Sequence, residues 1–351
     1  MDGWGRQGPD SRTIHAPTMK QGNKGKNMRA LLIESKGATA HLTDADPDLL
    51  EGPVELDVLY SSLNYKDGLA LTGKGIARSW PLIPGIDIVG RVTRSESPEW
   101  NSGDTVILNG SGIGESAHGG YADQARVAPD FLVRLPGTLT AYQAAAIGTA
   151  GFEAAIAVQK ILDSAVAPGD GELLVTGAAG GVGSIACALL ARHGYQVVAS
   201  SGRGDEEAAY LKELGAQRII DRATLADEAG APLQKQLWAA AIDVAGGTTL
   251  ANVLAQTSYG GLVVACGMAQ SAELSITVFP HILRDVTLAG ADTVSAPLAT
   301  RTRAWELLAA DLDLSVLEGM STTIELDQVP DRAEEILAGR VRGRTAVRLT
   351  A

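Results

Sequence analysis

The stretch of this sequence best suited to chemistry is a short apolar run that ends in glycines. Residues 172–183 read Glu-Leu-Leu-Val-Thr-Gly-Ala-Ala-Gly-Gly-Val-Gly. The run predicts a strand, a tight turn and then a helix over Ser184–His193. Free N–H groups and the positive end of the helix dipole meet at such a helix start, so it favours an anion such as a pyrophosphate.

The glycines of this turn have separate tasks. Gly180 and Gly181 let the backbone approach the anion, and Gly183 lets the helix pack close to the strand. The usual dinucleotide pattern begins with glycine, whereas this chain has Ala178 at that place. The alternative is a glycine turn with a structural role alone. We expect the pyrophosphate to face Ala179, Gly180, Gly181 and Val182.

The residues after the next predicted strand, Gln196–Ser200, indicate which nucleotide is bound. An acidic residue at this place, a little under about 20 residues past the turn, would hold a ribose 2′-hydroxyl. The chain instead reads Ser201, Gly202 and Arg203, with no carboxylate. A hydroxyl and a guanidinium bind a 2′-phosphate that a carboxylate would repel. The sequence therefore predicts NADPH rather than NADH, the alternative being a solvated arginine at a helix start.

Composition limits the classes to which this protein can belong. The chain has 351 residues, 45% apolar and 20% charged, which is typical of a soluble globular protein of about two domains. A formal charge of −12 argues against nucleic acid as a partner. Two cysteines suggest neither a disulfide framework nor a metal cluster.

No targeting or membrane signal is expected in this chain. No run approaches the ~18–20 apolar residues that a membrane-spanning helix needs. Residues 1–27 are polar and rich in glycine, without the apolar core of a secretory signal, so we expect a disordered extension there. A cytoplasmic location without membrane contact follows.

Two bodies are expected from the order of the patterns. Short β-type runs fill residues 28–148 and predict a β-rich domain. Alternating strands and helices fill residues 149–294, which predicts an α/β, doubly wound parallel sheet covered by helices on both faces. Residues 295–351 are too few for a domain, and we expect them to pack back onto the β-rich domain. A cleft between the two bodies is the expected site.

Five short motifs, in this order, resemble the medium-chain dehydrogenase/reductase superfamily, and more narrowly its zinc-independent acryloyl-CoA reductase branch. They are Ser62–Gly68 with Leu71–Gly75, Pro84–Asp87, Gly148–Phe152, Ser201–Arg203 and Gly343–Thr345. The resemblance covers residues 28–351. It implies a Rossmann domain at 149–294 beside a β-rich, GroES-like catalytic domain at 28–148, and a homodimer. The activity it implies is NADPH-dependent reduction of the α,β double bond of a short enoyl-CoA, with acryloyl-CoA as first substrate.

Zinc is not expected. The zinc-dependent branch of this superfamily carries Gly-His-Glu where this chain has Gly85-Ile86-Asp87, and it has four closely spaced cysteines for a structural zinc. Catalytic zinc needs about three protein ligands that converge on one point, and Asp87 alone does not supply them.

Tyr65 and Asn64 are the catalytic candidates that the resemblance implies, on a loop that faces the nicotinamide. The Tyr65 phenol, in a family position that also contacts the cofactor, would donate a proton to the α-carbon or only orient the ligands. We expect Lys66 and Asp67 to pair with each other at the surface.

The resemblance adds four residues to the cofactor site. Arg222 matches a position near the adenosine phosphate, and Arg344 one that reaches the cofactor or the CoA. Met268 and Thr293 lie where the family's backbone meets the nicotinamide. A solvated arginine is the alternative for both Arg222 and Arg344.

Two other functions remain open at this point. One is an NADPH quinone oxidoreductase, which shares the glycine turn and the missing zinc. The other is a non-catalytic relative that only binds NADPH, against which the retained motif Asn64–Asp67 argues.

Overall fold

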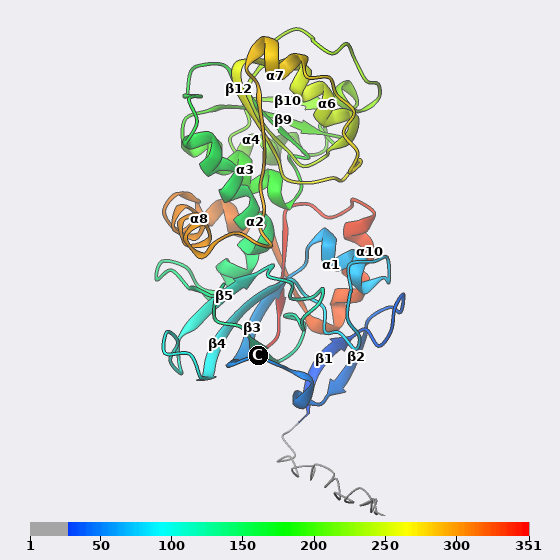
Figure 1. The fold of residues 1–351 in the computed structure, drawn as a ribbon, viewed down its shortest axis with the longest axis vertical. Helices are drawn as coiled ribbons and strands as arrows, with labels where there is room; N and C mark the ends of the chain where they lie inside the picture. Colours follow the sequence, from blue (N-terminus) through cyan, green and yellow to red (C-terminus); the bar gives the residue numbers. More distant parts are fainter. Residues whose placement is uncertain (1–26, 351) are drawn as a thin grey trace, which may run out of the picture.

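The structure, a computed structural model, describes residues 27–350. The disordered extension predicted for residues 1–27 therefore lies outside the described residues, apart from Asn27. Two bodies, one above the other in Figure 1, each contain a large sheet.

A six-stranded sheet forms the upper body, and all its neighbouring strands are parallel. Its strands are, from edge to edge, β10 (Arg218–Asp221), β9 (Gln196–Ser201), β8 (Glu172–Thr176), β11 (Trp238–Asp243), β12 (Thr257–Ala265) and β13 (Thr287–Gly290). In β8, Leu173 and Val175 pack into one hydrophobic cluster and Leu174 into another, so the strand is buried on both faces. This burial explains its continuous apolar sequence. The predicted Rossmann-type sheet is confirmed.

The strand order of this sheet determines where a ligand can bind. The chain runs from β8 to β9 and β10 on one side and to β11, β12 and β13 on the other, so its direction of winding reverses next to β8. Ligands of such sheets bind at the carboxyl ends of the strands where this reversal occurs. The helices of the body are α3 (Gly181–Arg192), α4 (Ala208–Glu213), α5 (Ala223–Ala226), α6 (Gly247–Gln256) and α7 (Phe279–Arg284).

The lower body contains a seven-stranded, mostly antiparallel sheet, as predicted for a β-rich body. Its order is β14 (Ser321–Glu325), β15 (Arg344–Arg348), β3 (Val54–Ser62), β4 (Asp87–Ser95), β5 (Thr105–Asn109) and β7 (Val133–Arg134), with β6 (Gln124–Val127) paired to β3. β1 (Met28–Leu32) and β2 (His41–Ala45) form a separate hairpin. Because β15 pairs with β3, the end of the chain belongs to the sheet that the first third of the chain builds.

Helix α2 (Ala141–Leu162) lies between the two bodies and contacts α3 above and β3 below. By length and composition it is apolar enough to cross a membrane, which corrects our expectation that no segment would be. However, 83% of its most apolar window is buried inside the protein, as expected of a core helix. The helix is kinked at Gly148, whose φ of 52° is in the left-handed region that favours glycine.

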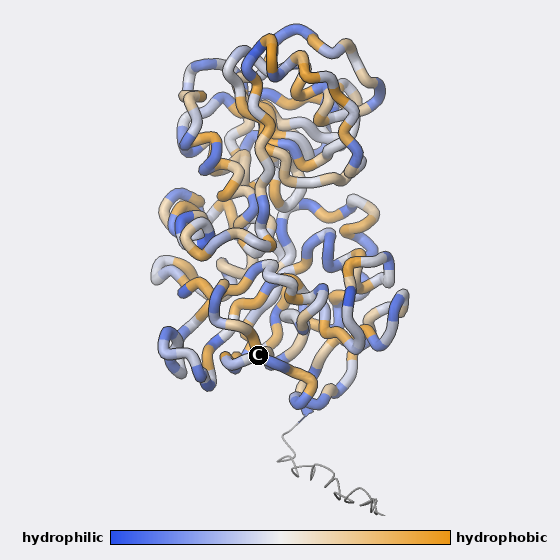
Figure 2. Tube along the Cα trace, in the orientation of Figure 1, coloured by the Kyte–Doolittle hydropathy of each residue, from blue (hydrophilic) through white to orange (hydrophobic). Residues whose placement is uncertain are grey.

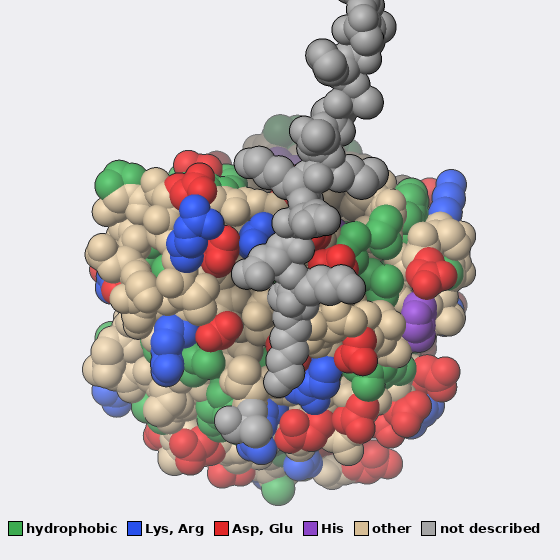
Figure 3. Space-filling model, turned by 90° about the horizontal axis from the view of Figure 1, so that it is seen from below, with side chains coloured by type: hydrophobic (Ala, Val, Ile, Leu, Met, Phe, Trp, Pro, Cys, Tyr) green, Lys and Arg blue, Asp and Glu red, His purple; other side chains and the backbone are tan. Residues whose placement is uncertain are grey.

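The remaining helices come from the C-terminal segment and from one short motif. α8 (Leu298–Asp311) packs on α2, and α10 (Val329–Leu337) packs on α1 (Tyr65–Leu71); α9 (Leu314–Gly319) and two short 3-10 helices, Pro47–Leu49 and Leu326–Gln328, complete the set. Figure 2 shows hydrophobic residues concentrated along the inner strands and hydrophilic ones at turns. The view in Figure 3 shows acidic and basic side chains interspersed over the lower end of the molecule.

Candidate cofactor and catalytic site

The glycine turn between β8 and α3 fits a pyrophosphate. β8 ends at Thr176 and α3 begins at Gly181. Gly180 is the N-cap of this helix, and no side chain makes a capping hydrogen bond there. A Cβ at Gly183 would collide with the carbonyl oxygen of Gly177, so only glycine fits where this helix meets the strand. A Cβ at Gly180 would meet only that oxygen, at 3.2 Å. The first N–H groups of α3 are therefore uncapped and approachable, as an anion site requires.

The C-terminal segment closes one side of this turn. The N–H of Gly343 donates to the carbonyl oxygen of Ala179 at 3.2 Å. A Cβ at Gly181 would lie 3.0 Å from the Arg344 guanidinium. Val182 is half-buried in the first turn of α3. The four residues predicted to face the pyrophosphate thus lie together. They are next to a C-terminal segment that the sequence pattern of the glycine turn does not include.

The residues predicted for the 2′-phosphate lie beside the turn, because β9 is the neighbour of both β8 and β10. Ser201 ends β9, and its carbonyl oxygen accepts from the N–H of Arg222 at 3.1 Å. A Cβ at Gly202 would lie 2.5 Å from Nε of Arg222, so the guanidinium lies directly against this glycine. The fold therefore brings Ser201, Gly202, Arg203 and Arg222 to one edge of the sheet.

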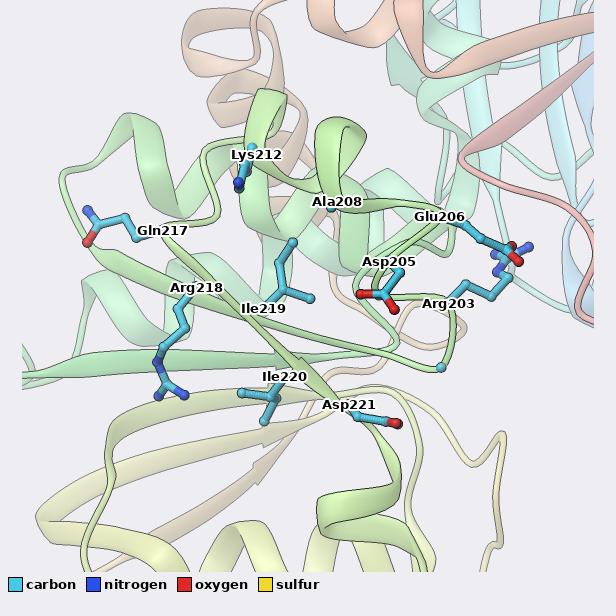
Figure 4. A pocket seen from close by; sticks show the side chains of 12 residues that line it. Arg203, Asp205, Glu206, Ala208, Lys212, Gln217, Arg218, Ile219, Ile220 and Asp221 are labelled. Atoms are coloured by element: carbon cyan, nitrogen blue, oxygen red, sulfur yellow. The ribbon is translucent and has the colours of Figure 1, made fainter.

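A pocket of about 590 Å³ lies over β10, and its lining includes Gly202 and Arg203. Figure 4 shows that the Arg203 side chain extends towards Glu206, away from Ile219 and Ile220 on the strand. Nε of Arg203 lies 3.9 Å from Glu207. The Arg203 guanidinium is thus at the rim of this pocket rather than inside it.

Met268 and Thr293 lie at the carboxyl ends of the neighbouring strands β12 and β13, in the other half of the sheet. Met268 is exposed and Thr293 is buried. The carbonyl oxygen of Thr293 accepts from Nη2 of Arg301 at 3.0 Å, and a Cβ at Gly110 of the lower body would lie 2.6 Å from it. This end of the sheet therefore borders the lower body.

Tyr65 is the first residue of helix α1 and is 50% exposed. The prediction that Tyr65 lies on a loop is wrong. A helix begins here because Asn64 takes an extended conformation as N-cap and its N–H donates to the Asp67 carboxylate at 2.9 Å. A carboxylate three residues into a helix is a common way to fix its start. The helix thus presents the Tyr65 side chain at its exposed first turn.

Asn64, by contrast, is 8% exposed and has every polar atom of its side chain bonded. Its Nδ2 donates to Asp87 at 2.8 Å and to Asp67 at 3.0 Å, and its Oδ1 accepts from Nη1 of Arg344 at 3.1 Å. Arg344 is itself buried, and its Nε donates to the carbonyl oxygen of Ala146 at 2.8 Å. The structure therefore places Asn64 and Arg344 in a buried network beneath the glycine turn.

Asp87, at the start of β4, is the acceptor at the centre of this network. Its two carboxylate oxygens accept from Asn64, from Asn109 at 2.6 Å, from both the N–H and the hydroxyl of Thr149, and from Ser62. These donors occupy the lone pairs that a metal ion would need. Across residues 27–350 no group of three or more His, Cys, Asp and Glu is placed to hold a metal ion. The donor set around Asp87 therefore does not fit zinc.

Lys66 and Asp67 do not pair with each other, contrary to expectation. Lys66 forms an ion pair with the buried Glu115, whereas Asp67 is 1% exposed and accepts from the N–H of Ile86 at 2.9 Å. Burial, together with the nearby charge of Asp87, raises the pKa of Asp67 to about 7. Adjacent residues on a helix point in different directions, which separates the two charges.

Two groups near the junction were missed by the sequence interpretation. Burial raises the pKa of Glu153, on α2, to about 8, with Asp292 raising it and Lys66 lowering it. These two charges belong to different bodies, so Glu153 lies where the bodies meet. The second group is a set of arginines near Arg203 that includes Arg340 and Arg342. The motif Gly-Arg-Val-Arg-Gly-Arg at 339–344 was the signal for it.

Known families and proteins match both bodies. Residues 51–137 match the family "Alcohol dehydrogenase GroES-like domain" and residues 181–310 match "Zinc-binding dehydrogenase". The chain is 50% identical over 326 residues to the probable acrylyl-CoA reductase AcuI of Escherichia coli (strain K12), covering 92% of this chain and 100% of that protein. It is 41% identical over 309 residues to the putative quinone oxidoreductase YhfP of Bacillus subtilis (strain 168), covering 88% and 93%.

A solved structure is equally similar. The oxidoreductase yhdH of Salmonella enterica, crystallised in complex with NADP, superposes with a TM-score of 0.89 at 47% identity, covering 92% of this chain and 100% of that one. Sequence and structure therefore agree over both bodies, including the GroES-like domain that the motifs implied. The chain belongs to the medium-chain dehydrogenase/reductase superfamily, in the branch of the acryloyl-CoA reductases.

Proposed function

We propose that this chain is an NADPH-dependent reductase of short enoyl-CoA thioesters that converts acryloyl-CoA to propanoyl-CoA. The observation that carries the proposal is the placing of an uncapped glycine turn beside Ser201, Gly202 and Arg203. The identity of 50% with a probable acrylyl-CoA reductase, over the whole length of that protein, supports the substrate. The complex of a close structural neighbour with NADP supports the cofactor.

The residues named above would hold NADPH in three groups. Ala179, Gly180, Gly181 and Val182 would bind the pyrophosphate through backbone N–H groups, and Ser201, Gly202, Arg203 and Arg222 would bind the adenosine end. Met268, Thr293 and Tyr65 would line the nicotinamide end, and Arg344 would support the turn from below.

When bound, reduced nicotinamide supplies the hydride that adds to the β-carbon of the thioester. The chain must then deliver a proton to the α-carbon and stabilise the charge on the carbonyl oxygen. The half-exposed phenol of Tyr65 is our first candidate for the proton donor. Asn64 would act by fixing the start of α1, since its side chain is occupied by Asp67, Asp87 and Arg344.

We infer that the reaction needs no zinc, although one matching family carries zinc in its description. The five donors around the Asp87 carboxylate support this. Turnover should be unchanged after dialysis against a chelator, and elemental analysis of the purified protein should find less than one zinc per ten chains. Loss of turnover that added zinc restores would contradict the inference.

Domain division and assembly are also proposals. We assign residues 28–148 to the catalytic domain, 149–294 to the NADPH-binding domain and 295–351 to the return onto the catalytic domain. A homodimer is supported by an exposed apolar patch next to the edge strand β13. The patch lies on α7 and on the residues just before it, and consists of Ile276, Val278, Phe279, Ile282 and Leu283. Light scattering after size-exclusion chromatography would measure it. A cytoplasmic location, without nucleic-acid or membrane partners, stays a prediction.

An NADPH quinone oxidoreductase is the second candidate, supported by 41% identity to a putative enzyme of that kind. The deciding experiment follows NADPH absorbance with acryloyl-CoA, crotonyl-CoA and a quinone side by side. We expect the highest kcat/KM with acryloyl-CoA. A higher value with the quinone would favour the second candidate, and no turnover with any of the three would indicate a protein that binds NADPH without catalysis.

A further inference from the structure

A second pocket, of about 280 Å³, lies between the loop after β9 and the C-terminal segment. Its lining includes one carboxylate, that of Glu207, and four arginines: Arg203, Arg332, Arg340 and Arg342. The whole chain has a formal charge of −12, so this concentration of positive charge is local. Such a group of guanidinium side chains is suited to phosphate.

Part of this positive charge is not neutralised by the protein. Nη1 of Arg342 donates to Glu207 at 3.2 Å, and Nε of Arg203 lies 3.9 Å from the same residue. Arg332 pairs with Glu335, yet its Nε is buried and has no hydrogen-bond partner in the described residues. Arg340 forms no ion pair with any residue of 27–350. Buried donors in native proteins almost always have a partner, so the pocket has unused donors.

The pocket is connected to the cofactor site on one side. The segment that carries Arg340 and Arg342 continues to Gly343, whose N–H donates to Ala179 in the glycine turn. Arg342 is fixed over the ring of Tyr210, 4.8 Å from its centroid. The pocket therefore has a fixed wall, and its C-terminal segment continues directly into the glycine turn.

We propose that this pocket binds the ribose 3′-phosphate of the acyl-CoA substrate through Arg332, Arg340 and Arg342. The proposal rests on the function proposed above. We assign the 2′-phosphate of NADPH to Ser201, Gly202, Arg203 and Arg222, which belong to the upper body. The other three arginines come from the return segment of the lower body: Arg332 lies on α10, and Arg340 and Arg342 lie between α10 and β15. CoA carries a ribose 3′-phosphate that suits this arginine pocket, whereas the reacting acyl group carries no charge.

Equilibrium binding separates the two nucleotides without turnover. Adenosine 3′,5′-bisphosphate mimics the phosphorylated end of CoA, and adenosine 2′,5′-bisphosphate mimics that of NADPH. For the variant Arg332→Ala/Arg340→Ala we expect the Kd of the 3′,5′ isomer to rise about 10-fold to 100-fold, as for loss of charge-assisted hydrogen bonds. The Kd of the 2′,5′ isomer should change less than about twofold. Equal weakening of both isomers, or weakening of the 2′,5′ isomer alone, would assign the pocket to the cofactor and overturn the proposal.

Kinetics supply the second readout. Acryloyl-pantetheine lacks the phosphates of CoA, so in the wild type its kcat/KM should be lower than that of acryloyl-CoA. In the double variant this preference should shrink about tenfold. An unchanged preference in a folded variant would overturn the proposal. Arg348→Ala is the matched control, because Arg348 lies on β15 of the same segment and pairs with Glu325 away from the pocket.

Two further observations keep the test decisive. Urea unfolding would show whether the double variant is folded; if it is not, Arg340→Ala alone serves, since Arg340 is exposed. Wild-type protein that reduces no acyl-CoA would refute the proposed function, whereas the titration with adenosine 3′,5′-bisphosphate would still test the pocket. Failure of that titration in an active reductase would refute the pocket alone.

Discussion

Nη1 of Arg344 donates to Oδ1 of Asn64 at 3.1 Å, which joins two residues 280 positions apart in the chain. Arg344 also donates to Ser62, and its guanidinium is fully buried beside the carboxylates of Asp67 and Asp87. The last strand of the protein therefore holds the first turn of α1, from which Tyr65 extends. The single positive charge of Arg344 thus lies beside two buried acids at the point where both bodies meet.

Truncation of this arginine should destabilise the fold strongly. Arg344→Ala would leave Asp67 and Asp87 without their cation, so we expect a loss of about 3–5 kcal/mol in the free energy of unfolding, measured in urea. Arg344→Lys keeps the charge but not the planar set of donors and should lose less. A loss below about 1 kcal/mol for the alanine variant would contradict this account of the network.

Tyr65→Phe tests the proton donor. Tyr65 is 50% exposed, so removal of its hydroxyl should leave unfolding unchanged. If the phenol protonates the α-carbon, kcat with acryloyl-CoA should fall about 100-fold or more, as for loss of a general acid. Stopped-flow oxidation of NADPH measures it. Full turnover would show that Tyr65 only lines the site, and Glu153, whose pKa burial raises to about 8, would be the next acid to test.

Arg203→Ala tests the choice of nucleotide. Loss of a guanidinium that binds a 2′-phosphate should raise the KM for NADPH about 10-fold to 100-fold and leave that for NADH nearly unchanged. Steady-state kinetics with both nucleotides at saturating acryloyl-CoA would show the difference. A similar increase for both would mean that Arg203 does not recognise the 2′-phosphate.

Two glycines of the turn should respond differently to the same change. Gly183→Ala places a Cβ against the backbone of Gly177 and should cost about 1–3 kcal/mol in stability. Gly180→Ala meets only one oxygen, at 3.2 Å, so stability should fall by less than about 1 kcal/mol, while the new methyl weakens NADPH binding. Urea unfolding and fluorescence titration with NADPH measure the two effects. Equal stabilities would contradict the packing role of Gly183.

Asp67 should make stability depend on pH. Its pKa rises from 3.8 to about 7 on folding, so the folded chain holds this proton more tightly than the unfolded chain does. Its contribution is complete below pH 3.8 and is lost as the pH rises through about 7. Between pH 5 and pH 8 we expect a loss of about 2–3 kcal/mol that is absent in Asp67→Asn. Parallel pH profiles for the two proteins would refute the assignment.

Sequence by itself determined the parts of this protein whose patterns are local. The glycine turn, the residues after β9 and the alternation of strands and helices indicated a Rossmann sheet and a nucleotide site, because these features depend on neighbours a few residues apart. Helix α1 was missed because it has only seven residues, among them a glycine. Strands β2 and β6 give only a weak signal within residues 28–148, because polar residues interrupt both sequences, His-Leu-Thr-Asp-Ala and Gln-Ala-Arg-Val.

Only the tertiary structure decided what the buried charges do. Lys66 pairs with Glu115, Asp87 collects donors from four residues of three separate segments, and Arg344 reaches back to Asn64. The same packing brings arginines from three places around one pocket. They come from the segment before β15, from α10 and from the loop after β9. No local pattern contains these partners, because desolvation and charge depend on which segments the fold brings within a few ångströms of each other.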